Sequence, residues 1–120
     1  MEWYMNKRRF GIIGEKIAQG YLINKSYDIL KTNFYTQKGE IDIIAKKGKC
    51  IIFIEVKTRT SIKFGTPAMA INSIKKQHIK RAAQIFLYLK KLNRYEVRFD
   101  VIEIYINNGK CEINHIKGVM

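Results

Sequence analysis

The chain has 120 residues, 47% of them apolar and 12% aromatic, and a formal net charge of +13. This length and composition can bury enough surface for one core, which predicts a single domain over residues 1–120 and argues against disorder. No apolar run approaches the roughly 18 residues that span a bilayer, and no signal-peptide core follows the first residues, so we expect a cytoplasmic protein without a membrane partner.

The first half of the chain predicts one helix followed by three strands. Apolar residues between Phe10 and Leu22 recur at helical spacing, which predicts a helix over about residues 8–24. Apolar runs separated by turn residues predict strands at about 27–35, 40–46 and 50–58.

The second half predicts a long helix and a final hairpin. Thr66 is a candidate N-cap with Pro67 at the first helical position, and this helix is expected to reach about Leu92. A last strand over residues 95–106 leads through Asn-Asn-Gly into a short return strand. A helix that joins the third strand to the fourth suits a parallel crossover. We therefore expect an α/β domain with an αβββαβ core, a mixed sheet flanked by helices and an extra C-terminal strand.

The long helix lies in a strongly basic segment. Between Glu55 and Glu96 the chain has ten lysines or arginines and no acidic residue. Charge of one sign predicts a polyanionic partner, with nucleic acid as the first choice and an anionic membrane surface or simple solubility as alternatives. The helix is expected to pack through one apolar stripe, with its basic side chains mostly off that stripe. The stripe is Ile71, Ile74, His78, Ala82, Ile85 and Leu89, and the basic residues are Lys75, Lys76, Lys80 and Arg81.

The stretch GEIDIIAKKGKCIIFIEVKTR, residues 39–59, predicts a β-hairpin that carries carboxylates among its isoleucines. Side chains in a strand alternate between two faces. Ile41, Ile43 and Ala45 should therefore share one face of the first strand, and Asp42 should lie on the other.

The turn of this hairpin decides which residues face each other. A two-residue loop at Gly48-Lys49 would put Asp42 opposite Glu55, and a turn centred one residue earlier would put Glu40 there instead. Either register brings two carboxylates within about 5 Å, where they repel by roughly 3–4 kcal/mol at an effective dielectric near 20. The neighbouring Lys57, a proton on one acid or a divalent cation could offset this repulsion. Oxygen ligands suit Mg²⁺ or Mn²⁺, and a cross-strand ion-pair network is the competing interpretation.

Asp42 followed by Glu55-Val56-Lys57 resembles the D…(D/E)xK signature of restriction-endonuclease-like nucleases. GEID followed by EVK is similar to the motifs of archaeal Holliday-junction resolvases and RecB-type nucleases. The similarity is closer still to the YraN-like family of small bacterial proteins. Its pieces are GEKIAQGYL, YDILKTNFYTQKGEIDIIA, FIEVKTR, FGTPAMAI and RFDVIEI, which together cover most of the chain from Gly14 to Ile104.

The resemblance implies a restriction-endonuclease-like domain with a metal held by Asp42, Glu55 and the Val56 carbonyl. It implies Lys57 as the catalytic lysine and Glu15 as an extra acidic ligand, whereas the plain interpretation of Glu15 is a helix-surface acid. Further candidates are Glu40 and Gln84 beside the ligands and Arg59 on nucleic acid. Gln84 and Tyr88 match the QxxxY spacing of RecB-type enzymes, which can also be ordinary helix packing.

The leading hypothesis is a Mg²⁺- or Mn²⁺-dependent endonuclease that hydrolyses phosphodiester bonds of DNA, with branched DNA as one candidate substrate. The alternative is a nucleic-acid-binding module of the same fold that turns nothing over. A basic RNA- or ribosome-associated protein is a remoter interpretation, because no aromatic platform interleaved with basic residues stands out. Resolvase-like chemistry on two strands would suit a two-fold homodimer.

Overall fold

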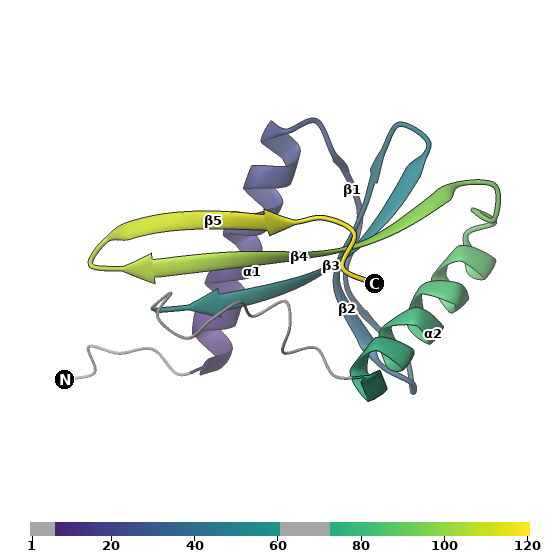
Figure 1. The fold of residues 1–120 in the computed structure, drawn as a ribbon, viewed down its shortest axis with the longest axis horizontal. Coiled ribbons are helices and arrows are strands. Elements are labelled where there is room, and N and C mark those ends of the chain that lie inside the picture. The colour runs from purple at the N-terminus through teal and green to yellow at the C-terminus, as the bar shows by residue number, and fades with distance from the viewer. Residues whose placement is uncertain (1–6, 61–72) are drawn as a thin grey trace.

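The computed structural model describes residues 7–60 and 73–120 (Figure 1). Its elements are α1 (Lys7–Asn24), β1 (Asp28–Tyr35), β2 (Glu40–Lys47), β3 (Cys50–Arg59), α2 (Ser73–Leu89), β4 (Glu96–Asn107) and β5 (Lys110–Ile116). The αβββαβ order with an added terminal strand confirms the predicted fold class. The expected helix start at Thr66 and Pro67 lies outside the described residues. No helix among the described residues is long and apolar enough to cross a membrane.

The five strands form one mixed sheet in chain order, β1-β2-β3-β4-β5. Strands β3 and β4 pair in parallel, and the other neighbours pair antiparallel. Helix α1 packs mainly on β3 and α2 packs on β2, so the two helices cover different parts of the sheet (Figure 1). The β4–β5 hairpin crosses α1 and lies apart from α2, except where β4 begins (Figure 1).

Two apolar clusters hold the helices to the sheet. Beneath α1, Leu22 is buried with Ile54 and Ile104. Beneath α2, Phe86 meets the ring of Phe53 edge-to-face at 6.2 Å between centroids. Both clusters draw on β2 and β3, so these two strands form the part of the sheet that is apolar on both faces.

The buried face of α2 differs from the predicted stripe. Ile74, Ile85 and Leu89 are exposed, whereas the buried residues are Ile79, Ala82, Ala83 and Phe86. Both sets fit helical spacing, and they share only Ala82. The small Ala82-Ala83 pair lets the helix approach the sheet closely, and Phe86 then fills the core beside it. Ile71 lies outside the described residues.

The predicted hairpin turn is confirmed, because Lys47 pairs with Cys50 and Gly48 adopts a positive φ of 60°. The pairing of β2 with β3 continues to Ile43 opposite Ile54 and ends there. The prediction that Ile41 shares a face with Ile43 is wrong. Ile41 is buried in the α2 cluster and Ile43 in the α1 cluster.

The change of face on β2 lies beside a residue of β1 with an unusual backbone conformation. Asn33 on β1 lies between the pairs Thr32–Ile43 and Phe34–Ile41, and its φ is 52°. A positive φ interrupts regular strand geometry, and asparagine tolerates it better than most residues. The alternation of faces along β2 breaks between Ile41 and Ile43, which is where β2 also leaves β3.

A buried polar network fixes the far end of the chain. The Asp100 carboxylate accepts hydrogen bonds from Arg98 at 2.8 Å and from the Gly118 N–H at 3.1 Å, and it lies 2.7 Å from His115 Nε2. Although burial opposes the shift, His115 and Arg98 hold the pKa of Asp100 below its usual range. Tyr21 on α1 contacts the other ring nitrogen of His115 at 3.0 Å, so the network joins β4, β5 and α1.

Candidate active site

The predicted acids meet at the point where β2 separates from β3. Asp42 immediately precedes Ile43, where the pairing of β2 with β3 stops, and its Oδ2 accepts a hydrogen bond of 2.8 Å from the Val56 N–H. Glu55, one residue before Val56, lies close enough for its charge to act on Asp42. The separation of the strands thus leaves room for side chains where ladder hydrogen bonds would otherwise run.

Asp42 is the most perturbed acid of this site. Its side chain is buried, with 8% of the residue exposed. Burial and the neighbouring Glu55 carboxylate raise the pKa of Asp42 to about 7, against the opposing effect of the Val56 hydrogen bond. Glu15 and Glu40 add smaller increases to this pKa. A carboxyl group that changes charge near neutrality is typical of functional sites.

Glu55 lies between two lysines. Its Oε1 accepts a hydrogen bond of 2.9 Å from Lys75 Nζ on α2, and Lys57 Nζ lies 3.8 Å away. Glu55 is the most buried of the three, with 13% of its side chain exposed against 41% for Lys75 and 26% for Lys57. Partial burial alone would lower the pKa of Lys75, but the ion pair with Glu55 outweighs this effect and raises the pKa.

Lys57 is shifted the other way. Partial burial lowers the pKa of Lys57, the Glu55 carboxylate opposes this, and the charges of Lys75 and Arg59 add to the lowering. An ammonium group whose pKa is lowered releases its proton more readily than that of an exposed lysine. The structure therefore brings two oppositely perturbed groups, Asp42 and Lys57, close to the Glu55 carboxylate.

Glu15 reaches the same acids from α1. Partial burial raises the pKa of Glu15, a hydrogen bond with Asn33 opposes this, and Glu40 and Glu55 add to the rise. The position of α1 depends on Gly14, where a Cβ atom would overlap the side chain of Thr58 on β3. The absence of a side chain at residue 14 lets the helix lie against the strand and brings Glu15 to the acids.

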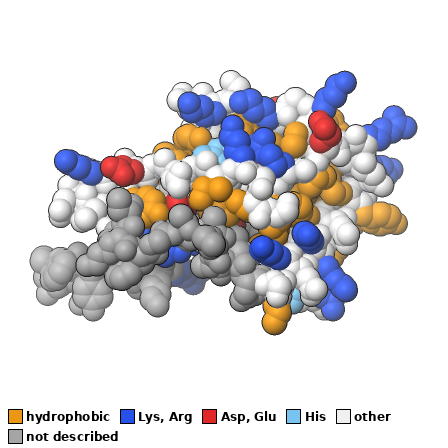
Figure 2. All heavy atoms as spheres, viewed as in Figure 1, with side chains coloured by type: hydrophobic (Ala, Val, Ile, Leu, Met, Phe, Trp, Pro, Cys, Tyr) orange, Lys and Arg blue, Asp and Glu red, His pale blue; other side chains and the backbone are white. Residues whose placement is uncertain are grey.

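The remaining predicted residues lie around this centre. Glu40 is exposed at the start of β2 and interacts electrostatically with both Asp42 and Glu15. Lys80 and Arg81 are exposed on α2, and the neighbouring Lys76 is half-buried. Figure 2 shows many basic and few acidic side chains on the visible described surface. Lys75 forms an ion pair with Glu55, so the row of basic side chains on α2 begins at the site formed by Asp42 and Glu55, called here the acid site.

Gln84 is not brought to the acids. It lies nine residues beyond Lys75 on α2, which is roughly 13 Å along a helix that rises 1.5 Å per residue. There it lines a separate hollow together with Tyr88. A supporting role for Gln84 at the metal ligands does not fit this position.

Sequence reasoning missed two features beside Lys57. Glu103 on β4 is paired with Lys57 in the sheet register and is 1% exposed. Its Oε1 accepts a hydrogen bond of 2.8 Å from Asn114, whereas its buried Oε2 has no hydrogen-bond partner. The buried Nε of Arg59 likewise has none. The signal for Glu103 was an acid inside the apolar run DVIEI, whose neighbour could be named only once the β3–β4 register was known.

The donor set offers two close carboxylates rather than a complete cage. Among residues 7–60 and 73–120, no three His, Cys, Asp or Glu side chains are grouped closely enough to hold a metal ion. Mg²⁺ is commonly bound through one or two carboxylates, with waters and substrate phosphates completing the coordination. Asp42 and Glu55 fit this mode, and they do not fit a fully protein-bound zinc or calcium site.

A mixed sheet in αβββαβ order, with two acids and a lysine where the central hairpin opens, defines a restriction-endonuclease-like α/β fold. Within that class the chain belongs to the uncharacterised protein family UPF0102, whose family model matches residues 14–104. This confirms the YraN-like resemblance drawn from the sequence motifs.

Relatives agree over nearly the whole chain. The UPF0102 protein of Caldicellulosiruptor bescii is 48% identical over 116 residues, covering 94% of this chain and 98% of its own. The UPF0102 protein of Caldanaerobacter subterraneus is 45% identical over 115 residues, covering 93% and 94%. A structure described as the crystal structure of SSO0001 is 24% identical, covers 88% of this chain and 48% of its own, and aligns with a TM-score of 0.34.

Proposed function

We propose that this protein is a divalent-metal-dependent endonuclease that hydrolyses phosphodiester bonds of DNA, with branched DNA as the substrate to test first. One observation carries the proposal: Asp42 is buried beside Glu55, with its pKa raised to about 7, next to a lysine whose pKa is lowered. Carboxylates held together against their own repulsion destabilise a fold unless a cation or proton compensates them. The basic surface of α2 begins at the same acids, which supports a polyanionic substrate.

Asp42 and Glu55 would hold Mg²⁺ or Mn²⁺, with the Val56 carbonyl and Glu15 as further oxygen donors by family resemblance. When bound, such an ion supplies charge that polarises a phosphodiester and acidifies an attacking water. The Val56 N–H orients the Asp42 carboxylate through the 2.8 Å hydrogen bond. Lys57 can hold a proton near the scissile phosphate and stabilise developing negative charge.

The test is a cleavage screen on linear duplex, flapped, four-way and single-stranded DNA with Mg²⁺ or Mn²⁺. We expect cleavage by the parent, none by Asp42→Asn and none by Lys57→Ala. Lys31→Ala, an exposed lysine on the edge strand β1, serves as the matched control and should cleave like the parent. Lys57→Ala should still bind metal, because its amine acts on the reaction rather than as a ligand.

The competing function is a nucleic-acid-binding module without turnover. It is favoured by the two lysines at Glu55, which already compensate one acid without a metal. The absence of cleavage on every substrate, together with melting temperatures of parent and Asp42→Asn that Mg²⁺ leaves unchanged, would establish that alternative. A homodimer would present two sites to a four-way junction, and light scattering with and without that DNA tests it.

A further inference from the structure

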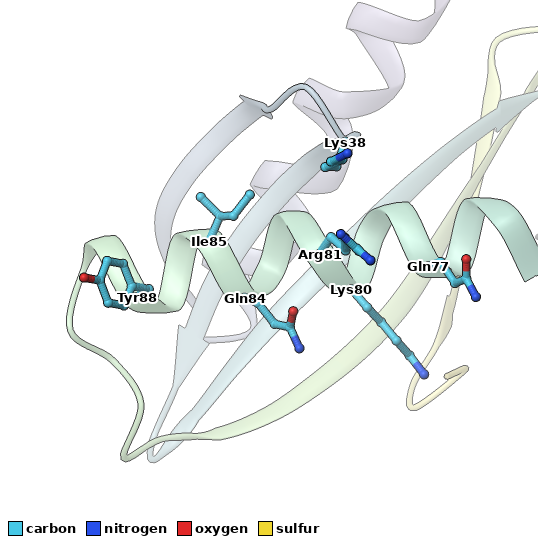
Figure 3. Close-up of a pocket in the computed structure, with 7 residues that line it drawn as sticks. All are labelled: Lys38, Gln77, Lys80, Arg81, Gln84, Ile85 and Tyr88. Atoms are coloured by element: carbon cyan, nitrogen blue, oxygen red, sulfur yellow. The ribbon is translucent and has the colours of Figure 1, made fainter.

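Helix α2 and the β1–β2 turn line an open, shallow hollow of about 690 Å³ that lies outside the acid site. Six of its lining residues come from α2, and Lys38 comes from the turn (Figure 3). We propose that this hollow binds an unpaired segment of nucleic acid, with phosphates on its cations and a base against Tyr88. The binding stands by itself, and its link to cleavage rests on the function proposed above.

The turn that forms one wall is held against the helix. A Cβ at Gly39 would lie 2.9 Å from the Cβ of His78 and 3.2 Å from its backbone carbonyl, so only glycine allows this approach. Thr36 Oγ1 accepts hydrogen bonds from the N–H groups of Lys38 at 3.1 Å and Gly39 at 3.0 Å. The backbone of Lys38 is therefore fixed beside α2.

The hollow is positively charged. Its charged lining residues are Lys38, Lys80 and Arg81, with no carboxylate among the lining, and the sequence of α2 contains no acid. In Figure 3, Lys38 lies over the middle of the helix near Arg81, and Lys80 projects from the same stretch. Three cations that line one hollow without an acid among them favour a partner with several phosphates.

Apolar and amide groups share the hollow with these cations. Tyr88 and Ile85 are large hydrophobic residues of α2, yet Tyr88 is 76% exposed and Ile85 is 37% exposed. Gln77 and Gln84 offer amide donors and acceptors in the same lining. A duplex presents mainly sugars and phosphates to a surface, whereas an unpaired strand also offers base faces for stacking and base edges for hydrogen bonds. This mixture therefore fits an unpaired strand better than a duplex backbone.

The helix links the hollow to the acids. Lys75, which pairs with Glu55, precedes Tyr88 by thirteen residues, a rise of roughly 20 Å. A stacked strand has one phosphate per about 3.4 Å, so roughly six nucleotides span this distance. A strand lying along α2 from Tyr88 would reach Glu55, which predicts substrates that expose a single-stranded arm beside the cleavage point.

The test measures binding by fluorescence anisotropy in EDTA, where no metal-dependent cleavage occurs. The probes are a twelve-nucleotide single strand and the matching duplex. Tyr88→Ala should weaken single-strand binding about 5- to 150-fold, as expected for the loss of one stacked base, and should leave duplex binding nearly unchanged. Tyr88→Phe should bind like the parent because it keeps the ring. Tyr35→Ala, which removes a tyrosine 67% exposed on β1, is the matched control and should also bind like the parent.

An equal effect of Tyr88→Ala on single strand and duplex, or no effect on either, would overturn the proposal. So would displacement of the single strand by polyglutamate at equal charge concentration, because the hollow would then be a general site for acidic chains. If no substrate is cleaved but the binding results are as expected, the nuclease proposal is ruled out and the single-strand binding hollow stands. If the protein cleaves DNA in an Asp42-dependent way but Tyr88→Ala binds the single strand like the parent, the nuclease proposal stands and the strand-binding hollow is ruled out.

Discussion

The ionised form of Asp42 destabilises the folded protein. Its pKa is raised from an ordinary value near 4 to about 7, mainly by burial and by Glu55. The folded chain therefore holds this proton more tightly than the unfolded chain does. Stability from this group is fully present below about pH 4 and is lost as the pH rises through 7.

Replacing Asp42 by Asn should flatten this dependence. Asparagine can still accept the Val56 N–H bond but has no charge to bury. At pH 8 without metal, we expect Asp42→Asn to be more stable than the parent by on the order of 2 kcal/mol, with little difference near pH 4. Urea unfolding in EDTA at both pH values measures this, and a variant less stable than the parent at pH 8 would show that the charge is stabilising there.

Lys75 places a positive charge directly at the Glu55 carboxylate. Its ammonium is 2.9 Å from Glu55 Oε1, so it competes with any metal for that oxygen. Lys75→Ala should tighten Mn²⁺ binding by roughly 1 kcal/mol, about fivefold, after allowance for solvent screening. Lys76→Ala is the sequence-adjacent control. Calorimetric titration measures the Mn²⁺ affinity of each variant, and an unchanged affinity in Lys75→Ala would place the metal away from Glu55.

Sequence reasoning reached some residues of this site and not others. Asp42 and Glu55 could be brought together because a two-residue turn fixes the register of a hairpin. Lys75 was expected only as a phosphate contact, because its distance from Glu55 depends on how α2 packs. Asn33 had no local signal, since its contact with Glu15 follows from a backbone kink in an edge strand.

Among the elements, α1 has glycines with opposite roles. A Cβ at Gly20 would meet no atom within 4 Å, whereas one at Gly14 would overlap Thr58. Gly20→Ala should therefore stabilise the protein by up to about 1 kcal/mol through helix propensity. Gly14→Ala should destabilise it by roughly 1–3 kcal/mol through overpacking, and adding Thr58→Ala should restore part of the loss.

Denaturant midpoints of the three variants measure these effects. Equal stabilisation by Gly14→Ala and Gly20→Ala would mean that α1 does not lie against Thr58. Such a result would also remove the reason for Glu15 to approach Asp42.

Helix boundaries show what local patterns leave open. Helix α2 was expected to reach Leu92 and ends at Leu89, because Lys91 adopts a φ of 56° and the Leu92 N–H bonds back to the Leu87 carbonyl. Such an ending usually carries glycine, which would have marked it in the sequence. The rotation of α2 was equally open, since two sets of residues matched helical spacing and only contact with the sheet separates them.

At the scale of the whole molecule, charge separates into two regions. The protein carries +13, yet Asp42 and Glu55 lie close together beside the acid-free helix α2, with Glu15 near enough for its charge to act on Asp42. A phosphate chain would be attracted by the helix and repelled by the acids unless a cation covers them. Binding and metal loading should consequently reinforce each other.

Binding to DNA should depend steeply on salt. Six or more phosphate contacts would weaken affinity about 10³-fold or more between 50 and 200 mM salt. Replacing Lys80 and Arg81 together by Gln should reduce the slope of log affinity against log salt by about 2, and Lys110→Gln at the β4–β5 turn should not change it. Anisotropy titrations give the slopes, and an affinity indifferent to salt would rule out phosphate contacts as its source.

The parallel pairing of β3 with β4 has a consequence for the order of folding. The β2–β3 and β4–β5 hairpins join neighbours in sequence and can form within microseconds, whereas β3 and β4 must meet across the whole crossover. Glu55 lies on β3 and Lys75 within the crossover, so their ion pair belongs to this late, long-range step. We expect pulsed hydrogen exchange to show β2–β3 amides protected before those that join β3 to β4. The Lys75 side of the acid site would then be among the last parts of the molecule to be assembled, and slow-folding variants would accumulate as chains with formed hairpins and no Glu55–Lys75 ion pair.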